Sequence, residues 1–221
     1  MKVSAQMLND IKPFALSETV SSLLDVMEEL KYSHLPLVDG ERNYVGLISA
    51  DDLLEIEEQE EEVARHMRFV TPYSIAEGSN IFNAIRIIGE GNLSLLPVVN
   101  QDNQYRGYVP AIEILQDMGK EMTFTEPGSI AVLRIPGRDY HLSQIAQIVE
   151  SEDARILGLH MAADHESDQL LVCLKINQVD LSRILQAFER YNYVVTEVYH
   201  QSLFDDGLQE RYQSFMKYLN T

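Results

Sequence analysis

The sequence predicts a mixed α/β and α+β protein, in which a tandemly duplicated β-α-β-β-α unit precedes a separate β-α-β-β-α-β domain. The duplication is visible in residues 33–38 (SHLPLV), which return as residues 94–99 (SLLPVV) at a constant spacing of 61 residues. The second domain is indicated by Pro127-Gly128, a dipeptide typical of a boundary, after which the order of elements changes. We therefore expect two domains, the first of them duplicated.

Both copies of the repeat show the same expected elements. The duplicated domain spans residues 1–122, with the first repeat at about 1–60 and the second at about 61–122. In each copy an amphipathic helix precedes two short apolar runs joined by a polar turn, which is typical of a hairpin. The expected strands are 35–38 and 44–48, then 96–99 and 105–109. A last helix begins near Asp51 and Asp52 in one copy and near Ile112 and Glu113 in the other. Because about 60 residues bury little surface alone, we expect the copies to pack together.

These motifs resemble those of a tandem CBS-domain pair, or Bateman module. The resemblance covers residues ~1–120 and rests on the S-x-L-P strand motif and on the segment Gly46-Leu47-Ile48-Ser49-Ala50-Asp51-Asp52 that closes the first copy. It implies a regulatory module that binds an adenine nucleotide or adenosyl ligand between the repeats. With the second domain included, the architecture resembles the AcuB-type acetoin-utilisation proteins.

Ser49, Asp51 and Asp52 are the first candidate binding residues. Ser49 followed three positions later by Asp52 is a capping-box-like arrangement, worth about 1 kcal/mol to the fold with no ligand involved. The functional alternative is that the Asp52 carboxylate accepts two hydrogen bonds from a ribose diol while amides at the helix start face a phosphate. In proteins that resemble this one, the matching residues contact nucleotide ribose and phosphate.

The resemblance also implies which other residues complete the site. His34 is expected near the phosphate, although a surface histidine without a partner is the equal alternative. Tyr73, Leu93 and Ser94 are expected to line an adenine pocket. A second, degenerate site would involve Ser33, Pro110 and Glu113. Proline at position 110 removes both the hydroxyl and the amide donor that the motif needs, so we expect one working site per chain.

Composition narrows the classes of function. The net charge of −18 disfavours nucleic acid and anionic membrane surfaces as partners. The N-terminus has no apolar signal segment, and no stretch approaches the ~18 apolar residues that span a bilayer, so we expect a cytoplasmic protein. No nucleophile and base occur at a recognised catalytic spacing, and no metal-ligand motif is present. We expect neither catalysis nor a required cofactor or metal.

Two features favour structural interpretations. The single Cys173 lies in an apolar run and is interpreted as a small core residue rather than a nucleophile. The acidic run at residues 57–62 resembles a carboxylate metal site, but a solvated linker helix is the favoured interpretation.

The second half predicts a ferredoxin-like domain at residues 123–221. The expected order is a strand (129–135), a helix (142–150), a hairpin (154–163 and 169–176), a helix (180–190) and a strand (193–200). In size and order this half resembles an ACT domain. The turn where ACT domains use a glycine places His141 before the helix and Gly137 upstream. Amino-acid binding and dimerisation alone therefore both stay open.

The second half contains two histidines near the hairpin and an apolar pattern in its C-terminal tail. His160 and His165 near the hairpin could bind a metal, but solvated turn residues are the favoured interpretation. The C-terminal tail is spaced for an amphipathic helix that packs on its own domain. Its apolar positions are Leu208, Tyr212, Phe215, Met216 and Leu219.

The sequence as a whole predicts a non-catalytic regulator. It is expected to bind AMP, ADP, ATP or S-adenosylmethionine, to form a homodimer and to act on an unknown protein partner. The alternative is a structural or adaptor protein whose nucleotide site has decayed and which acts through dimerisation and protein contacts. The altered second copy favours the adaptor, and the intact segment from Gly46 to Asp52 favours the regulator.

Overall fold

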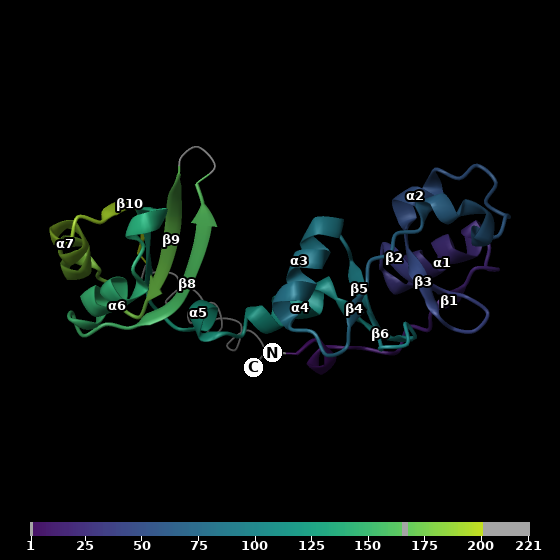
Figure 1. The fold of residues 1–221 in the computed structure, drawn as a ribbon, viewed down its shortest axis with the longest axis horizontal. Helices are drawn as coiled ribbons and strands as arrows, with labels where there is room; N and C mark the ends of the chain where they lie inside the picture. The colour runs from purple at the N-terminus through teal and green to yellow at the C-terminus, as the bar shows by residue number, and fades with distance from the viewer. Residues whose placement is uncertain (1, 165–167, 201–221) are drawn as a thin grey trace, which may run out of the picture. The chain divides into compact units, whose positions relative to one another are not determined.

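The computed structural model describes residues 2–164 and 168–200 and divides the chain into two compact units, Met1–Gly119 and Lys120–Thr221. Figure 1 labels most of their helices and strands, numbered in chain order. The first unit contains both repeats, and each repeat has a hydrophobic cluster of its own. The second unit has a separate core.

The first repeat contains the predicted elements around a three-stranded sheet. Strand β2 lies in the middle, parallel to β1 and antiparallel to β3. Helix α1 buries Val20, Leu23 and Met27, which recur at helical spacing and form its apolar face. The elements are β1 (Phe14–Ala15), α1 (Val20–Leu30), β2 (His34–Val38), β3 (Tyr44–Ser49) and α2 (Ala50–Leu54).

The second repeat has the same order and the same sheet pairing. Its strand β5 is parallel to β4 and antiparallel to β6, and all five residues of β5 are buried. The elements are β4 (Ile75–Ala76), α3 (Ile81–Gly91), β5 (Leu95–Val99), β6 (Tyr105–Pro110) and α4 (Ala111–Met118). The mixed α/β fold predicted for this half is therefore confirmed.

The duplication extends to unusual backbone conformations. Lys31 and Asn92 end the first helix of each copy with φ angles of 60° and 49°, and Arg42 and Asn103 occupy the hairpin turns with φ angles of 67° and 59°. Residues other than glycine seldom adopt a positive φ. Because the members of each pair are 61 positions apart, the two copies share local geometry as well as sequence.

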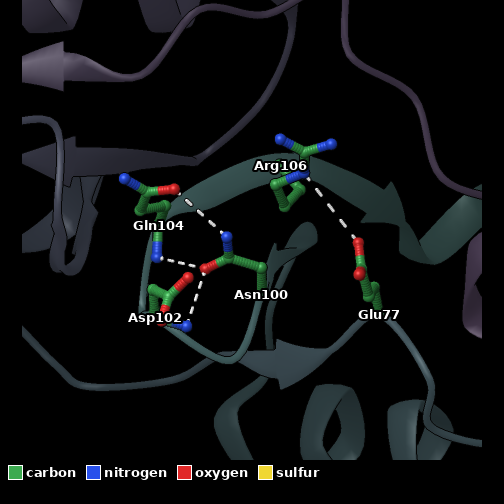
Figure 2. Close-up of polar contacts among 5 residues, drawn as sticks. All are labelled: Glu77, Asn100, Asp102, Gln104 and Arg106. Atoms are coloured by element: carbon green, nitrogen blue, oxygen red, sulfur yellow. Dashed lines mark hydrogen bonds and ion pairs between the residues drawn. The ribbon is translucent and has the colours of Figure 1, made fainter.

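Asn100 organises the turn between β5 and β6, as Figure 2 shows. Its side-chain oxygen accepts hydrogen bonds from the backbone amides of Asp102 (3.0 Å) and Gln104 (2.8 Å), and its amide nitrogen donates to the Gln104 side chain (3.1 Å). Asparagine favours such turns because its short side chain reaches the backbone two residues on. Beside this turn, the Arg106 guanidinium lies 3.9 Å from the Glu77 carboxylate.

Asp39 organises the matching turn of the first repeat. Its carboxylate accepts hydrogen bonds from the backbone amides of Glu41 (2.9 Å) and Asn43 (2.8 Å) and from the Asn43 side chain (3.0 Å). The bonds from Asn43, the side-chain bond first, lower the pKa of Asp39. The two hairpin turns are thus built by the same device.

Side-chain caps begin the first helix of each copy. The Thr19 hydroxyl accepts from the Ser22 amide (3.3 Å) at α1, and the Asn80 side chain accepts from the Asn83 amide (3.1 Å) at α3. These bonds satisfy amides that have no partner within the helix.

Replacing the cap of α3 should weaken the fold modestly. We expect Asn80→Ala to lower the free energy of unfolding by about 1 kcal/mol, because the Asn83 amide loses its acceptor. Urea unfolding measures the change. Asn83→Ala is the matched control, since its exposed side chain is in the same turn and only its backbone takes part in the cap. An equal loss in both variants would contradict the role of Asn80.

The segments that precede each repeat pack on the other copy. Val3 and Ile11 are buried in the core of the second repeat, and Leu8 exchanges two backbone hydrogen bonds with Tyr108 on β6 (2.8 and 2.9 Å). Thr71 does the same with Leu47 on β3 of the first repeat (2.7 and 2.9 Å). The expected first repeat, residues 1–60, therefore begins with a segment that packs on the second repeat. Each repeat thus has apolar side chains of its sheet covered by the segment that precedes the other repeat.

The C-terminal unit shows the predicted order of strands and helices. Its sheet has the strand order β10-β7-β9-β8, and neighbouring strands are antiparallel. A short helix, α5 (Met122–Thr125), precedes it and was not predicted. The other elements are β7 (Ser129–Pro136), α6 (Leu142–Glu150), β8 (Ile156–Ala163), β9 (Gln169–Ile176), α7 (Ser182–Arg190) and β10 (Val194–Tyr199).

The core of this unit lies between the sheet and its two longer helices. Alternate residues of β7 and β9, such as Leu133 and Val172, are buried against Ile145 of α6 and Phe188 of α7.

The prediction that Cys173 is a core residue is wrong. Its neighbours Val172 and Leu174 point into the core, so the half-buried Cys173 lies on the opposite face of the sheet. Partial burial, assisted by Glu197, raises the pKa of its thiol.

The linker helix expected at the acidic run is also wrong. Residues 57–62 form turns, and the carbonyls of Gln59 and Glu61 accept hydrogen bonds from the amides of Ser21 (2.8 Å) and Val20 (3.0 Å). These amides open α1 and have no partner within it. The backbone of the run therefore caps α1. The predicted tail helix and His165 lie outside the described residues.

Candidate functional site

The turn from β3 into α2 positions Ser49 and Asp52. The Ser49 hydroxyl accepts a hydrogen bond from the Asp52 amide (3.1 Å) and donates to the Asp52 carboxylate (2.5 Å). Both residues are half-buried, and Asp51 beside them is exposed. The capping interaction expected from the sequence is thus present, and it holds the Asp52 carboxylate at the start of the helix.

His34 lies directly across the sheet from Ser49. The two residues are paired in the antiparallel register of β2 and β3, so the imidazole is close to the start of α2. Burial lowers the pKa of His34, while the carboxylates of Asp51 and Asp52 oppose the shift. The structure thus brings together four of the predicted site residues.

Ser94 reaches this group from the second repeat. Its hydroxyl lies 3.2 Å from His34 Nδ1, and its backbone amide donates a hydrogen bond to the same nitrogen (3.3 Å). The Ser33 hydroxyl, 3.1 Å from Nδ1, approaches from the first repeat. Ser33 was assigned from the sequence to the second site, but the structure places it with His34. His34 is therefore not a surface histidine without a partner.

Tyr73 and Leu93 lie close together beside the end of α3. A Cβ added at Gly91 would lie 2.9 Å from the Leu93 side chain and 3.0 Å from the Tyr73 ring, so both border the same glycine. Leu93 is buried and directly precedes Ser94, the residue that contacts His34. Tyr73 and Leu93 therefore lie next to the group around His34. The Tyr73 carbonyl accepts a hydrogen bond from the Tyr44 hydroxyl (2.6 Å).

The matching position in the second copy lacks this polar group. Pro110 is buried and precedes α4 without any side-chain cap, and Glu113 lies half-buried in the first turn of that helix. Opposite Pro110 in the register is Leu95, a fully buried apolar residue where the first copy has His34. The structure brings Pro110 and Glu113 together at the start of α4. Proline and leucine stand there in place of the Ser49 hydroxyl and the His34 imidazole of the first copy.

The sequence interpretation missed two hollows. A groove of about 440 Å³ runs along α1 and α2, and Ser33 is the predicted residue that lines it; Leu24, Met27, Tyr32, Ala50 and Leu54 also line it. A pocket of about 440 Å³ in the C-terminal unit is lined by polar side chains from β7, α6 and the segment before β10. His141 borders this pocket, and so do Arg134, Asp139, Gln144 and Tyr193. Of these residues, only His141 was singled out from the sequence, at the turn compared with that of ACT domains. The others come from separate segments that meet only in the folded unit.

Within residues 2–164 and 168–200, no group of three or more His, Cys, Asp or Glu side chains is arranged to hold a metal ion. His160 is exposed on β8. In the same part of the chain, every helix is too short or too polar to cross a bilayer.

The comparison with protein families settles what the first unit is. The model of the CBS domain matches residues 4–58 and again residues 62–120, which together make up just over half of the chain. The chain belongs to the CBS domain family. Its two repeats are therefore a CBS pair, as the motifs around Ser49 predicted.

The similar proteins match about half of the chain. The inosine-5'-monophosphate dehydrogenase of Aquifex aeolicus is 26% identical over 99 residues, which are 44% of this chain and 20% of the relative. The chain therefore spans about a fifth of the length of such curated relatives. A CBS domain pair/ACT domain protein from Thermotoga maritima is 24% identical with a TM-score of 0.48, over 53% of this chain and 96% of that one. The structure of CBSX2 in complex with AMP is 23% identical with a TM-score of 0.46, over 53% and 95%.

Proposed function

We propose that the CBS pair is a non-catalytic regulatory module that binds an adenine nucleotide or an adenosyl ligand around Asp52. The observation that carries the proposal is the convergence of Ser49, Asp52, His34 and Ser94 from both repeats of a CBS pair. Such a site can respond to a ligand because it contains contributions from two packed units. A ligand shifts the arrangement of the units only by binding one arrangement better than another.

Each polar group has a role in this proposal. The Asp52 carboxylate has further acceptor sites beyond its bond to Ser49, and these would accept hydrogen bonds from a ribose diol. His34 would lie near the phosphate, and Tyr73 and Leu93 would supply apolar surface for the adenine ring. Asp51, exposed at the start of α2, would act through its charge.

A structural or adaptor protein is the second candidate. The Ser49–Asp52 hydrogen bonds favour it, because they give both side chains a structural role as a helix cap without any ligand. The altered helix start at Pro110 favours it as well. The two candidates differ in one respect that is easily measured, since an adaptor with a decayed site would not bind a nucleotide.

A thermal-shift series tests the proposal on the full chain. The ligands are AMP, ADP, ATP and S-adenosylmethionine, each followed by calorimetric titration where a shift occurs. A ligand at 100 times its dissociation constant should stabilise the protein by ~2.7 kcal/mol, or roughly 5–11 °C for a chain of this size. Absence of a shift with all four ligands would contradict the regulatory proposal and favour the adaptor.

We further propose that the C-terminal unit is a ferredoxin-like, ACT-like domain. The element order β-α-β-β-α-β and the strand order β10-β7-β9-β8 support this assignment. The polar pocket around Arg134 and Asp139 gives amino-acid binding a physical basis that the sequence did not provide. We also propose that the whole chain is similar in architecture to AcuB-type proteins. It would act on a protein partner that is not identified, and it would be located in the cytoplasm.

A homodimer is the last part of the proposal. Helices α3 and α4 pack against each other and expose large apolar side chains, with Phe82 at 74%, Leu115 at 64% and Ile112 at 51% exposure. Exposed apolar side chains of this size are typical of interaction surfaces when they cluster.

Leu115→Glu should therefore weaken the dimer. A buried, unpaired carboxylate in an apolar interface is strongly unfavourable, so we expect a shift toward monomer of at least tenfold in dissociation constant. Sedimentation velocity over a dilution series measures it. Gln116→Glu adds the same charge at an exposed neighbouring position and should leave association unchanged. A wild-type chain that is monomeric at every concentration would contradict the homodimer.

A further inference from the structure

His34 is bonded on one ring nitrogen to both repeats. Its Nδ1 lies 3.1 Å from the Ser33 hydroxyl and 3.2 Å from the Ser94 hydroxyl, and it accepts the Ser94 backbone amide at 3.3 Å. The second copy has the buried Leu95 at the matching position. The histidine contact is therefore a feature of the first copy, and it joins the strand motifs of both.

The backbone amide determines which form of the imidazole fits. A serine hydroxyl can donate or accept, but the Ser94 N–H can only donate. Nδ1 must therefore be unprotonated, and the hydrogen of neutral His34 resides on Nε2. When Nδ1 takes up a proton from solvent, it can still donate to a serine hydroxyl oxygen, but the Ser94 amide loses its acceptor. Protonation of His34 thus breaks one hydrogen bond between the repeats.

The surroundings of His34 act on its protonation in opposite directions. Asp51 and Asp52 at the start of α2 favour the protonated ring, while burial disfavours it and prevails, so that the pKa of His34 is lowered. The groups that the opposite strand and the loop before β5 place beside it are Ser49 and Ser94, which do not titrate near neutral pH. An additional negative charge in the site would shift this balance toward the protonated ring.

We propose that binding of a phosphate-bearing adenine ligand is coupled to proton uptake by His34, which releases the Ser94 amide and makes the site select anionic over uncharged adenine ligands. This inference rests on the proposed nucleotide site and adds its selectivity and its pH dependence. The proton comes from solvent, and the bond that forms is Nδ1–H. Adenosine carries the same base and ribose without the phosphate, so it should bind without proton uptake.

The sign of the pH dependence follows from linkage. If the complex binds more protons than the free protein, affinity for AMP increases as pH falls through the range between the two His34 pKa values. The increase approaches about tenfold per pH unit for one coupled proton. The AMP phosphate itself titrates near pH 6, so the effect must be read as a difference between wild type and a variant without the imidazole.

His34→Gln is that variant. The glutamine side-chain oxygen can accept the Ser94 amide and cannot take up a proton near neutral pH. We expect calorimetric titrations of AMP, in buffers of different ionisation enthalpy at pH 7, to show proton uptake by wild type that is absent in His34→Gln. Adenosine should show none with either protein. As pH falls, wild-type affinity for AMP should rise relative to the variant, by up to about tenfold per pH unit.

The outcomes separate this inference from the proposed function. Equal proton uptake by wild type and His34→Gln, or equal uptake with adenosine and AMP, would overturn the role of His34 while leaving nucleotide binding intact. An NMR titration of the His34 ring provides the independent measurement, since burial lowers its pKa in the free protein and the pKa should rise in the AMP complex. Absence of AMP binding by wild type would overturn the proposed function and the inference with it.

Discussion

Gly107→Ala is expected to lower the free energy of unfolding of the CBS pair by about 2–4 kcal/mol. A Cβ at this position would lie 2.2 Å from the Leu8 carbonyl oxygen, a backbone atom that cannot move alone. The N-terminal segment would have to withdraw from β6, which removes the two backbone hydrogen bonds between Leu8 and Tyr108. Urea unfolding followed by circular dichroism measures the loss.

Gly40→Ala is the matched control for this variant. Gly40 lies in the turn after β2, and nothing approaches within 4 Å of the position that its Cβ would take. We expect its effect to stay within about 0.5 kcal/mol. A Gly107→Ala protein as stable as Gly40→Ala would show that the N-terminal segment does not pack on the second repeat as described.

Asp52→Asn is expected to weaken AMP binding by about 2–4 kcal/mol, or roughly 30- to 1,000-fold. The reason is that hydrogen bonds from a ribose diol to a charged carboxylate become bonds to a neutral amide with one acceptor oxygen. The protein should stay folded, because the Ser49 hydroxyl still accepts the Asp52 backbone amide. Calorimetric titration with AMP measures the loss.

Asp25→Asn removes the same charge from the same repeat and provides the control. Asp25 is exposed on α1, and we expect AMP to bind this variant as it binds wild type. If both variants lost affinity equally, the effect would be one of net charge and not of a contact at Asp52. If neither lost affinity, the ligand would bind elsewhere in the chain.

Much of the fold is local enough to be predicted from the sequence. The 61-residue spacing determines the repeat, and helical or alternating periodicity identifies α6 and β9 to within a residue or two. The Ser49 cap was equally accessible, because capping depends on residues three positions apart. Features of this kind need no knowledge of what packs against them.

Features that depend on distant partners could not be predicted in this way. The acidic run became a turn because its carbonyls meet the first amides of α1, a contact that helix propensity does not include. The face occupied by Cys173 follows from where α6 and α7 pack, not from the apolar run around it. Likewise, nothing in the sequence next to His34 places Ser94 on its Nδ1 nitrogen.

The exchange of leading segments between the two repeats limits how this chain can be divided. A cut near residue 60 would leave one piece carrying Val3 and Ile11 without the core that buries them, and the other lacking its own cover. To transplant one repeat into another protein, its sheet would have to be moved together with the segment that precedes the other repeat. The smallest part of this half that keeps both cores covered is therefore the pair.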